Sequence, residues 1–283
     1  ERLFVFLLKL SIVERWAKLD ADKGMERYNK MIVGTLKPDD IHIAYKGYNY
    51  GINMNSVGQS QTMFARRVYE LLASNTVSVG NYSRGVKNMF GDLTVATDSA
   101  STMQKHLEKY CSTTEDYRKF RLLGLRAVLS EHLCEDRLGF IAQCVFGKDM
   151  REKLPLVTVV SSAEAASDRQ RVQKAFDRQS YTNKKLVFVS DGNADITDGF
   201  VAAFDKNDYY GENYLLDLVL SVRYSKAEGF GKLHYYTNEE NGFVLNGTEG
   251  TYKPCNTLFS TRAIVKAEKI TDIASFAEGA ELS

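Results

Sequence analysis

Short apolar runs alternate with amphipathic stretches along the whole chain, and this pattern is typical of a mixed α/β protein. In the first part of the chain, three apolar runs predict strands: YGINMN (50–55), TVSVGN (76–81) and LTVAT (93–97). Between the first two, TMFARRVYELLAS (62–74) predicts a helix, and longer helical patterns follow at 101–110 and 115–146. This order of elements predicts a parallel sheet with crossover helices.

The second part of the chain repeats the same pattern of strand, helix and strand. LVTVVSS (156–162) and LVFVSD (186–191) predict strands, and RQRVQKAFDRQS (169–180) between them predicts an amphipathic helix. A further apolar run, FVAAF (200–204), ends directly before Asp205. Ligands of such sheets bind beyond the carboxyl ends of the strands, where Asp191 and Asp205 are both expected.

A charged connector separates the two parts. GKDMREKLP (147–155) ends at one of only three prolines in 283 residues, so we expect one domain over 1–150 and a second over 151–283. Because the chain begins at Glu1, we expect it to be a piece of a longer protein.

Composition excludes several classes of protein. A net charge of +1 argues against a general nucleic-acid binder. The four cysteines form no CxxC pair, which disfavours a zinc site or a disulfide framework and favours a cytoplasmic setting. The most apolar segment, LFVFLLKLSIV (3–13), is too short to span a membrane, although peripheral association with a membrane remains compatible with it.

Side chains with oxygen ligands lie at the carboxyl ends of two predicted strands: Asp191 ends the strand 186–191, and Asp205, Asn207 and Asp208 follow the strand 200–204. Mg²⁺ and Mn²⁺ prefer such ligands, often one or two carboxylates together with substrate phosphates. The alternative is a polar turn, because Asp and Asn commonly bond their own backbone. The pattern leaves both interpretations open.

The segment LPLVTVVSSAEAASDRQRVQKAFDRQSYTNKKLVFVSDG (154–192) resembles the opening of family 2 glycosyltransferases with the GT-A fold. Gln179 and Tyr181 match the Q-x-Y element of that family, and FDKNDYYGENYLLDL (204–218) resembles its Asp-x-Asp segment. The resemblance implies that Asp191 contacts the nucleobase side of a nucleotide-sugar donor. It also implies that Asp205, Asn207 and Asp208 hold a divalent cation and the donor diphosphate.

The second domain departs from this family pattern at several positions. The Asp-x-Asp element is Asp205-Lys206-Asn207 here, so one negative charge is lost and Lys206 adds a positive charge beside the phosphates. Family 2 enzymes invert the anomeric centre and need a general base. Glu281 in EGAEL (278–282) is the candidate base, and a terminal helix is the alternative for this segment. NTLFSTRAIV (256–265) resembles the segment of this family just before its base, a strand that would here end in Arg262. Arg262 is either a phosphate contact or a surface charge.

In the first domain, SQTMFARRVYELLASNTVSVGNYSRGVKNMFGD (60–92) resembles the donor-binding half of a GT-B, group-1 glycosyltransferase of the spore-coat or surface-polysaccharide type. If the helix begins at Thr62, its free N–H groups can receive a diphosphate. Arg66 and Arg67 add positive charge, and the resemblance implies that Glu70 binds the donor ribose. The tyrosines of AYKGYNYG (44–51) either form a sugar platform or pack around a strand.

These patterns predict two Rossmann-like α/β domains, a GT-B C-terminal half followed by a GT-A nucleotide-sugar domain. The expected activity is transfer of a hexose from a nucleotide-sugar donor to a glycan, glycolipid or glycoprotein acceptor of the bacterial surface. Asp208 and Glu281 are the expected catalytic residues, and Mn²⁺ or Mg²⁺ is the expected cofactor. The alternative is a catalytically degenerate module that binds glycan or serves as a scaffold. A nucleotidyltransferase ranks third, because no glycine-rich loop follows the first strand of either domain.

Overall fold

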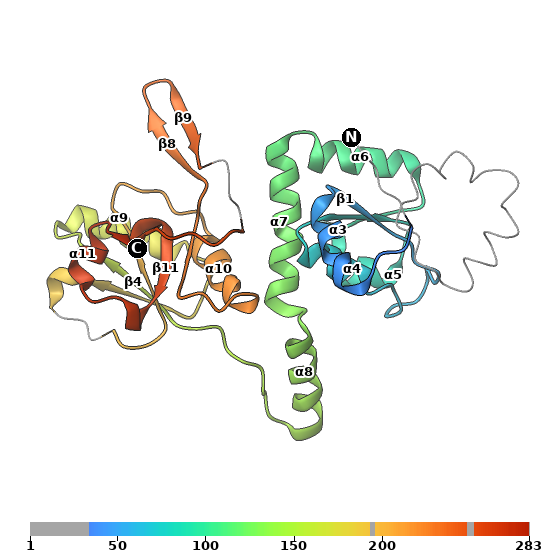
Figure 1. Cartoon of the computed structure of the whole chain (residues 1–283), viewed down its shortest axis with the longest axis horizontal. Coiled ribbons are helices and arrows are strands. Elements are labelled where there is room, and N and C mark those ends of the chain that lie inside the picture. Colours follow the sequence, from blue (N-terminus) through green and yellow to red (C-terminus); the bar gives the residue numbers. More distant parts are fainter. Residues whose placement is uncertain (1–33, 193–195, 248–251, 283) are drawn as a thin grey trace, which may run out of the picture. The chain divides into compact units, whose positions relative to one another are not determined.

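The computed structural model describes residues 34–192, 196–247 and 252–282. The chain divides into two compact units, Glu1–Met150 and Arg151–Ser283 (Figure 1). Both units contain parallel strands joined by helices, which confirms the prediction of a mixed, Rossmann-like α/β protein. Whether the units are a GT-B half and a GT-A domain stays a prediction.

The sheet of the first unit has three parallel strands in the order β1-β2-β3. They are β1 (Tyr50–Asn53), β2 (Val77–Gly80) and β3 (Val95–Ala96). Helix α4 (Arg67–Ala73) joins β1 to β2, and α5 (Arg84–Phe90) with the 3-10 turn η2 (Gly91–Leu93) joins β2 to β3. These elements confirm the predicted order of strands and crossover helices.

The further helices of this unit are η1 (Pro38–Asp40), α3 (Ile41–Gly47), α6 (Ala100–Cys111), α7 (Thr114–Glu131) and α8 (Cys134–Phe146). Serine and threonine hydroxyls cap three of the helix starts, at Ser83, Ser99 and Thr113. The apolar face of α4, formed by Val68, Leu71 and Leu72, is buried. Leu72 packs with Val128 of α7 in the core of the unit.

The expectation of one helix over 115–146 is wrong, because two residues outside helical structure separate α7 from α8. The Leu133 N–H donates to the Asp136 carboxylate (3.0 Å), which starts a new helix. His132 ends α7, and its ring lies against Tyr69 and Phe90. Arg137 has only donors, so its contact with His132 Nδ1 (2.8 Å) requires that this nitrogen be unprotonated.

This neutral histidine predicts acid sensitivity of the first unit. Burial, followed by the charge of Arg137, lowers the pKa of His132. Its contribution to stability is therefore complete above the unfolded pKa of about 6.5 and is lost as pH falls toward the lower pKa of the folded state. We expect His132→Gln, which cannot titrate, to reduce the loss of stability of the first unit below pH 6.5.

Hydrogen exchange of peptides from the first unit, measured between pH 7 and 5 with correction for intrinsic rates, checks this prediction. His42→Gln is the matched control, because it removes an exposed histidine from the same unit. Equal acid sensitivity of wild type and His132→Gln would contradict the prediction.

The second unit contains a mixed five-stranded sheet in the order β5-β4-β6-β11-β7. Strands β4 (Val157–Ser161), β5 (Lys184–Phe188) and β6 (Phe200–Ala203) are parallel, and β11 (Ala263–Lys266) pairs antiparallel with both β6 and β7 (Gly229–Gly231). Helix α9 (Ala166–Asp177) crosses from β4 to β5. The smaller elements are η3 (Val189–Asp191), α10 (Tyr214–Val219), η4 (Leu220–Arg223), the hairpin β8 (Tyr235–Glu239) and β9 (Gly242–Asn246), the pair β10 (Leu258–Phe259) and β12 (Glu281–Leu282), η5 (Ser260–Arg262), η6 (Ala267–Lys269) and α11 (Ile273–Ala277).

Both faces of the central strand β6 are buried, which explains the continuous apolar run FVAAF. Phe200, Ala202 and Phe204 belong to one core cluster with residues of α9 and α10. Val201 and Ala203 belong to a second cluster with Phe276 of α11. The first polar residue after this strand, Asp205, therefore begins where the core ends.

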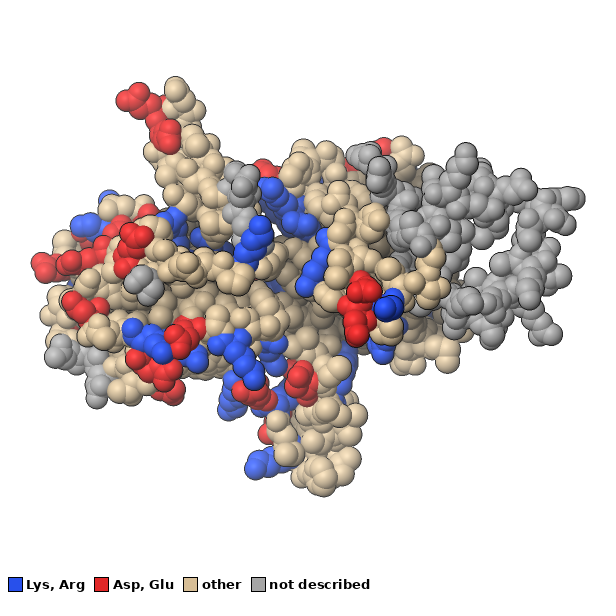
Figure 2. Space-filling model, viewed as in Figure 1, with Lys and Arg blue, Asp and Glu red and all other residues tan. Residues whose placement is uncertain are grey.

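The described residues include no helix that is long and apolar enough to cross a membrane. The apolar segment 3–13 lies outside the described residues. On the face of the second unit that Figure 2 shows, acidic and basic side chains are mixed, in keeping with the balanced composition.

Candidate functional site

The carboxylates Asp205 and Asp208 lie directly beyond the carboxyl end of β6. Phe204 and Tyr210 stack with ring centroids 3.9 Å apart and close the core beneath them. The Tyr210 hydroxyl accepts a hydrogen bond from the Asp205 N–H (3.0 Å). Its own proton has two acceptors within reach, the Ala203 carbonyl and the Asp208 carboxylate, both at 3.4 Å. Tyr210 therefore positions both ends of the Asp205–Asp208 turn.

The turn interpretation of this segment is confirmed. Asp205 Oδ1 accepts a hydrogen bond from the Asn207 N–H (2.7 Å), and the Asp208 N–H donates to the Asp205 carbonyl (3.3 Å). The Asp side chain thus bonds the backbone two residues on, as is typical of an Asx turn. Such a turn presents Asp205, Asn207 and Asp208 close together, so it is also compatible with a ligand site.

Two negative charges oppose each other in this turn. Partial desolvation raises the pKa of Asp208, although the residue as a whole is exposed, and the charge of Asp205 raises it further. The hydrogen bond from Tyr210 and the charge of Arg262 act in the opposite direction. A bound cation would relieve this repulsion.

The donor set of the turn fits Mg²⁺ or Mn²⁺. Asp205 and Asp208 offer carboxylate oxygens and Asn207 offers an amide oxygen, which are the hard ligands that these ions prefer. Within the described ranges, no three His, Cys, Asp or Glu side chains form a metal cluster. An ion at this turn would therefore complete its coordination with phosphate oxygens or water.

Asp191 is engaged elsewhere. Arg169 of α9 donates to both carboxylate oxygens of Asp191, at 3.0 Å from Nη1 and at shorter range from Nη2, and also to the Ser190 hydroxyl (2.7 Å). The guanidinium lies over the Phe188 ring, 4.6 Å from its centroid. This hydrogen bonding lowers the pKa of Asp191. A nucleobase would have to share or displace Arg169 to reach this carboxylate.

Lys206 also has a partner outside the turn. Its ammonium lies 2.8 Å from Asp168 Oδ2, in the first turn of α9. The pair holds the turn against α9, so the ammonium is turned toward Asp168 rather than left available to phosphates. Tyr209 is 79% exposed and stacks under Arg178, which donates to the Tyr210 carbonyl.

Arg262 ends the 3-10 turn η5, and strand β10 before it ends at Phe259, so the expectation of a strand that ends in Arg262 is wrong. The guanidinium lies over two rings, 3.9 Å from the centroid of Tyr235 and 4.4 Å from that of Phe259. Burial raises the pKa of Asp208 and of Tyr214, and the charge of Arg262 opposes part of each rise. Arg262 therefore belongs to the surroundings of the Asp205–Asp208 turn.

The candidate base Glu281 lies in strand β12, opposite Phe259 of β10, and its side chain is exposed. The alternative of a terminal helix is therefore wrong for Glu281, and helix α11 ends before it, at Ala277. Its role as a base stays a prediction.

In the first unit, the expected helix start at Thr62 is wrong, because α4 begins only at Arg67. The Ser60 hydroxyl accepts from the N–H groups of Thr62 (3.4 Å) and Met63 (2.9 Å), but no helix follows directly. The Ala65 N–H donates to Asn55 Oδ1 (3.0 Å) and keeps this segment on an irregular path. The N–H groups of Thr62, Met63 and Ala65 therefore have partners within the chain, and a role of Thr62 in donor binding stays a prediction.

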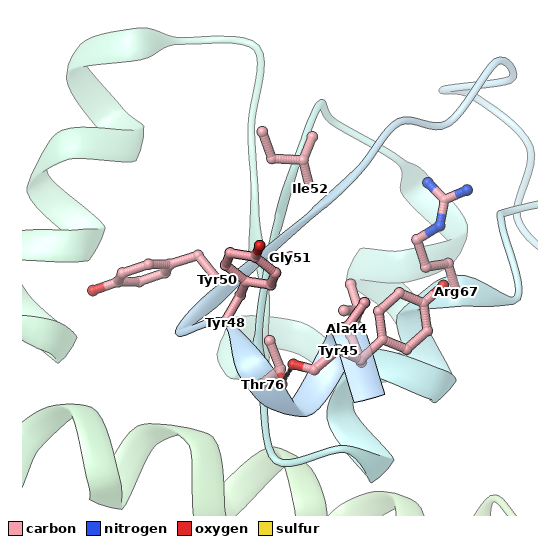
Figure 3. Close-up of a pocket in the computed structure, with 9 residues that line it drawn as sticks. Ala44, Tyr45, Tyr48, Tyr50, Gly51, Ile52, Arg67 and Thr76 are labelled. Carbon is pink, nitrogen blue, oxygen red and sulfur yellow. Dashed lines mark hydrogen bonds between the residues drawn. The ribbon is translucent and has the colours of Figure 1, made fainter. Parts of the chain in front are cut away.

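Glu70 is brought together with both arginines. The Arg66 Nε donates to Glu70 Oε1 (2.7 Å), and the Tyr45 hydroxyl donates to Glu70 Oε2 (3.3 Å). Arg67 and Tyr45 line one side of a pocket of about 310 Å³, and Tyr48 and Tyr50 line the other (Figure 3). Most of this volume is open to solvent, and the enclosed space of about 20 Å³ has room for little more than one water molecule.

The tyrosines of this pocket take part in packing. Tyr45 is buried, and Tyr50 packs against Tyr117 of α7 with centroids 5.7 Å apart. Packing around the strand is thus confirmed for these two tyrosines. A role as a sugar platform stays a prediction.

A pair of asparagines that the sequence analysis did not single out links the loops after β1 and β2. The Asn55 N–H donates to Asn81 Oδ1 (2.8 Å), and Asn81 Nδ2 donates to the Asn55 carbonyl (2.9 Å). Both residues are the last of a predicted strand, 50–55 or 76–81, so their position was the available signal. They shape the carboxyl edge of the sheet, where a ligand is expected.

Residues 7–143 match a family model described as glycosyl transferase-like. The match spans most of the first unit and supports a glycosyltransferase role in general terms. No curated protein matches the chain.

Proposed function

We propose that the chain is a glycosyltransferase that moves a hexose from a nucleotide-sugar donor to a glycan, glycolipid or glycoprotein acceptor of the bacterial surface. The observation that carries the proposal is the pair of carboxylates, Asp205 and Asp208, at the carboxyl end of β6. Parallel α/β sheets bind their ligands at this edge. The family match of the first unit supports the general class of activity.

In this proposal, Asp205, Asn207 and Asp208 hold Mg²⁺ or Mn²⁺ together with the donor diphosphate. The ion would neutralise charge on the leaving diphosphate. Tyr210 holds the turn in shape through its hydrogen bond to the Asp205 N–H. Glu281 is the proposed base that takes the proton of the acceptor hydroxyl as this oxygen attacks the anomeric carbon.

The first unit supplies a second group of residues that suits a donor. Arg67 lines the pocket, and Glu70, which pairs with Arg66 and accepts from the pocket residue Tyr45, is the proposed ribose contact. In this arrangement the first unit is a GT-B-like donor-binding half and the second is a GT-A-like domain. Cytoplasmic location, peripheral membrane association and a lipid-linked acceptor belong to the same proposal.

A catalytically degenerate module that binds glycan or serves as a scaffold is the second candidate. The specific observation that favours it is the pairing of Asp191 with Arg169, because this carboxylate has lost its freedom to bind a base. The Asn at position 207 points the same way, since it brings no charge to the metal.

Titration calorimetry of the full chain with UDP and GDP, with and without Mn²⁺, tests the proposal. We expect Mn²⁺-dependent binding of one nucleotide by wild type and a loss of at least about 100-fold in the double variant Asp205→Ala, Asp208→Ala, because metal and diphosphate lose their ligands. The matched control is Glu240→Ala, Glu268→Ala, which removes two exposed negative charges from the same unit.

Binding without Mn²⁺ that survives the Asp205, Asp208 double substitution would move the donor site to Arg66, Arg67 and Glu70. Absence of nucleotide binding in wild type would favour the binding or scaffold module.

A further inference from the structure

Arg262 is held by two aromatic rings and has unused donors. Tyr235 of β8 and Phe259 of β10 stack on its guanidinium at centroid distances of 3.9 and 4.4 Å. In the part of the chain that the structure describes, this guanidinium has no hydrogen bond or ion pair. A cation–π contact uses no hydrogen bond, so the N–H donors of the guanidinium are left available to a ligand.

Other arginines of the second unit are already engaged. Arg169 forms a bidentate pair with Asp191, and Arg178 donates to the Tyr210 carbonyl. Both therefore serve the structure of the unit. Arg262 differs from them, because the rings of Tyr235 and Phe259 contact its guanidinium without accepting hydrogen bonds from its N–H groups.

The turn that bears Arg262 is anchored beside the acidic turn. The Tyr214 hydroxyl donates to the Thr261 carbonyl (3.2 Å), and the Ser260 N–H donates to the Ala280 carbonyl (3.0 Å). Tyr214 also lies edge-on to Tyr210, with centroids 5.0 Å apart, and Tyr210 positions Asp205 and Asp208. The packed pair of Tyr210 and Tyr214 therefore hydrogen-bonds to both segments, Tyr210 to the Asp205–Asp208 turn and Tyr214 to the residue before Arg262.

We propose that Arg262 is the residue that recognises the terminal phosphate of a nucleoside diphosphate bound at the Asp205–Asp208 turn, an inference that rests on the proposed function. The planar guanidinium matches two oxygens of one phosphate group, which a lysine ammonium cannot do. Tyr235 and Phe259 are positioning residues, because they fix the guanidinium plane. Tyr235 belongs to the hairpin β8–β9, which projects from the rest of the second unit (Figure 1), so this hairpin contributes to the phosphate site through a single stacked ring.

The chemistry of this contact predicts selectivity among nucleotides. A residue that binds the terminal phosphate contributes to the affinity for UDP or GDP and adds nothing to the affinity for the bare nucleoside. Arg262 therefore sets the ratio between the affinities for the diphosphate and the nucleoside. A residue with a merely structural role would lower both affinities together.

Titration calorimetry of the full chain in Mn²⁺ with UDP, UMP and uridine, and with the three guanine counterparts, tests this inference. We expect Arg262→Ala to weaken diphosphate binding at least about tenfold and to leave nucleoside binding unchanged. Arg262→Lys keeps the positive charge but lacks the paired N–H donors of the guanidinium. We expect its loss of diphosphate affinity, on a logarithmic scale, to be about half of the loss in Arg262→Ala. Tyr235→Leu removes one stacking ring and is expected to lower diphosphate affinity less than Arg262→Ala does.

Lys269→Ala is the matched control, because it removes an exposed positive charge from the same unit. Thermal unfolding of each variant reports whether it folds, and Arg262→Lys provides the result if Arg262→Ala does not fold. Equal loss of diphosphate and nucleoside affinity, or unchanged diphosphate affinity in both Arg262 variants, would overturn the inference while Asp205 and Asp208 retain their proposed role. Wild type that binds no nucleoside diphosphate would overturn the proposed function and this inference with it.

Discussion

Phe204→Ala is expected to destabilise the second unit by about 3–5 kcal/mol, the usual cost of removing a fully buried phenylalanine. Phe204 has no exposed surface, and it stacks on Tyr210 with centroids 3.9 Å apart and an interplanar angle of 3°. Alanine would leave a cavity beneath the Asp205–Asp208 turn. Because Tyr210 holds this turn, we also expect weaker nucleotide binding wherever the variant remains folded.

Hydrogen exchange of the full chain measures this effect separately in the two units, since peptides from 1–150 and 151–283 are distinguishable. Phe243→Ala is the matched control: Phe243 is 76% exposed, so its removal is expected to change stability by less than about 0.5 kcal/mol. Similar protection of the second unit in both variants would show that the Phe204–Tyr210 stack is not part of a rigid core.

Gly80→Ala is expected to destabilise the first unit by about 3 kcal/mol, at the upper end for an overpacked core. A Cβ at Gly80 would lie 2.0 Å from the Asn53 carbonyl oxygen. That oxygen belongs to the backbone of the neighbouring strand, because Gly80 pairs with Asn53 between β2 and β1. No side chain can rotate away to relieve the contact, so the two strands would have to separate.

The control for this substitution is Gly47→Ala. An added Cβ at Gly47 meets no atom within 4 Å, and its φ angle is not in the left-handed region, so we expect little change or a slight gain in stability. Chemical denaturation followed by exchange of first-unit peptides compares the two variants. Equal stability of Gly80→Ala and Gly47→Ala would contradict the close approach of β1 and β2.

Local pattern predicted the parallel crossover strands of both sheets, because each is a short apolar run between polar segments, but it did not predict β7 or the separate strand β11. FVAAF and VTVVS supply residues to both core clusters of the second unit, and burial on two faces makes most of their positions apolar, with Thr158 and Ser161 as buried exceptions. The prediction was wrong at element ends. The Ser60 hydroxyl accepts from the N–H groups of Thr62 and Met63, yet no helix follows directly. In the predicted helix over 115–146, the hydrogen bond from the Leu133 N–H to the Asp136 carboxylate marks the start of a separate helix.

The candidate site was predictable only in part, for a related reason. Asp205, Asn207 and Asp208 are neighbours in sequence, so the sequence itself brings them together after β6. The partner of Asp191 is 22 residues away, and that of Lys206 is 38 residues away. No spacing rule connects such pairs, because they meet only where α9 packs against the edge of the sheet.

The sequence by itself determined the α/β class, the succession of parallel strands and helices along the chain, and the position of the acidic turn. These features follow from patterns of fewer than about fifteen residues. The tertiary structure alone decided which of the charged groups are already paired and which remain available. Arg262 illustrates the reason, because the rings that contact its guanidinium belong to Tyr235 of β8 and Phe259 of β10, and only the folded chain brings them there. Contacts between distant segments depend on packing, which local hydrophobic pattern does not encode.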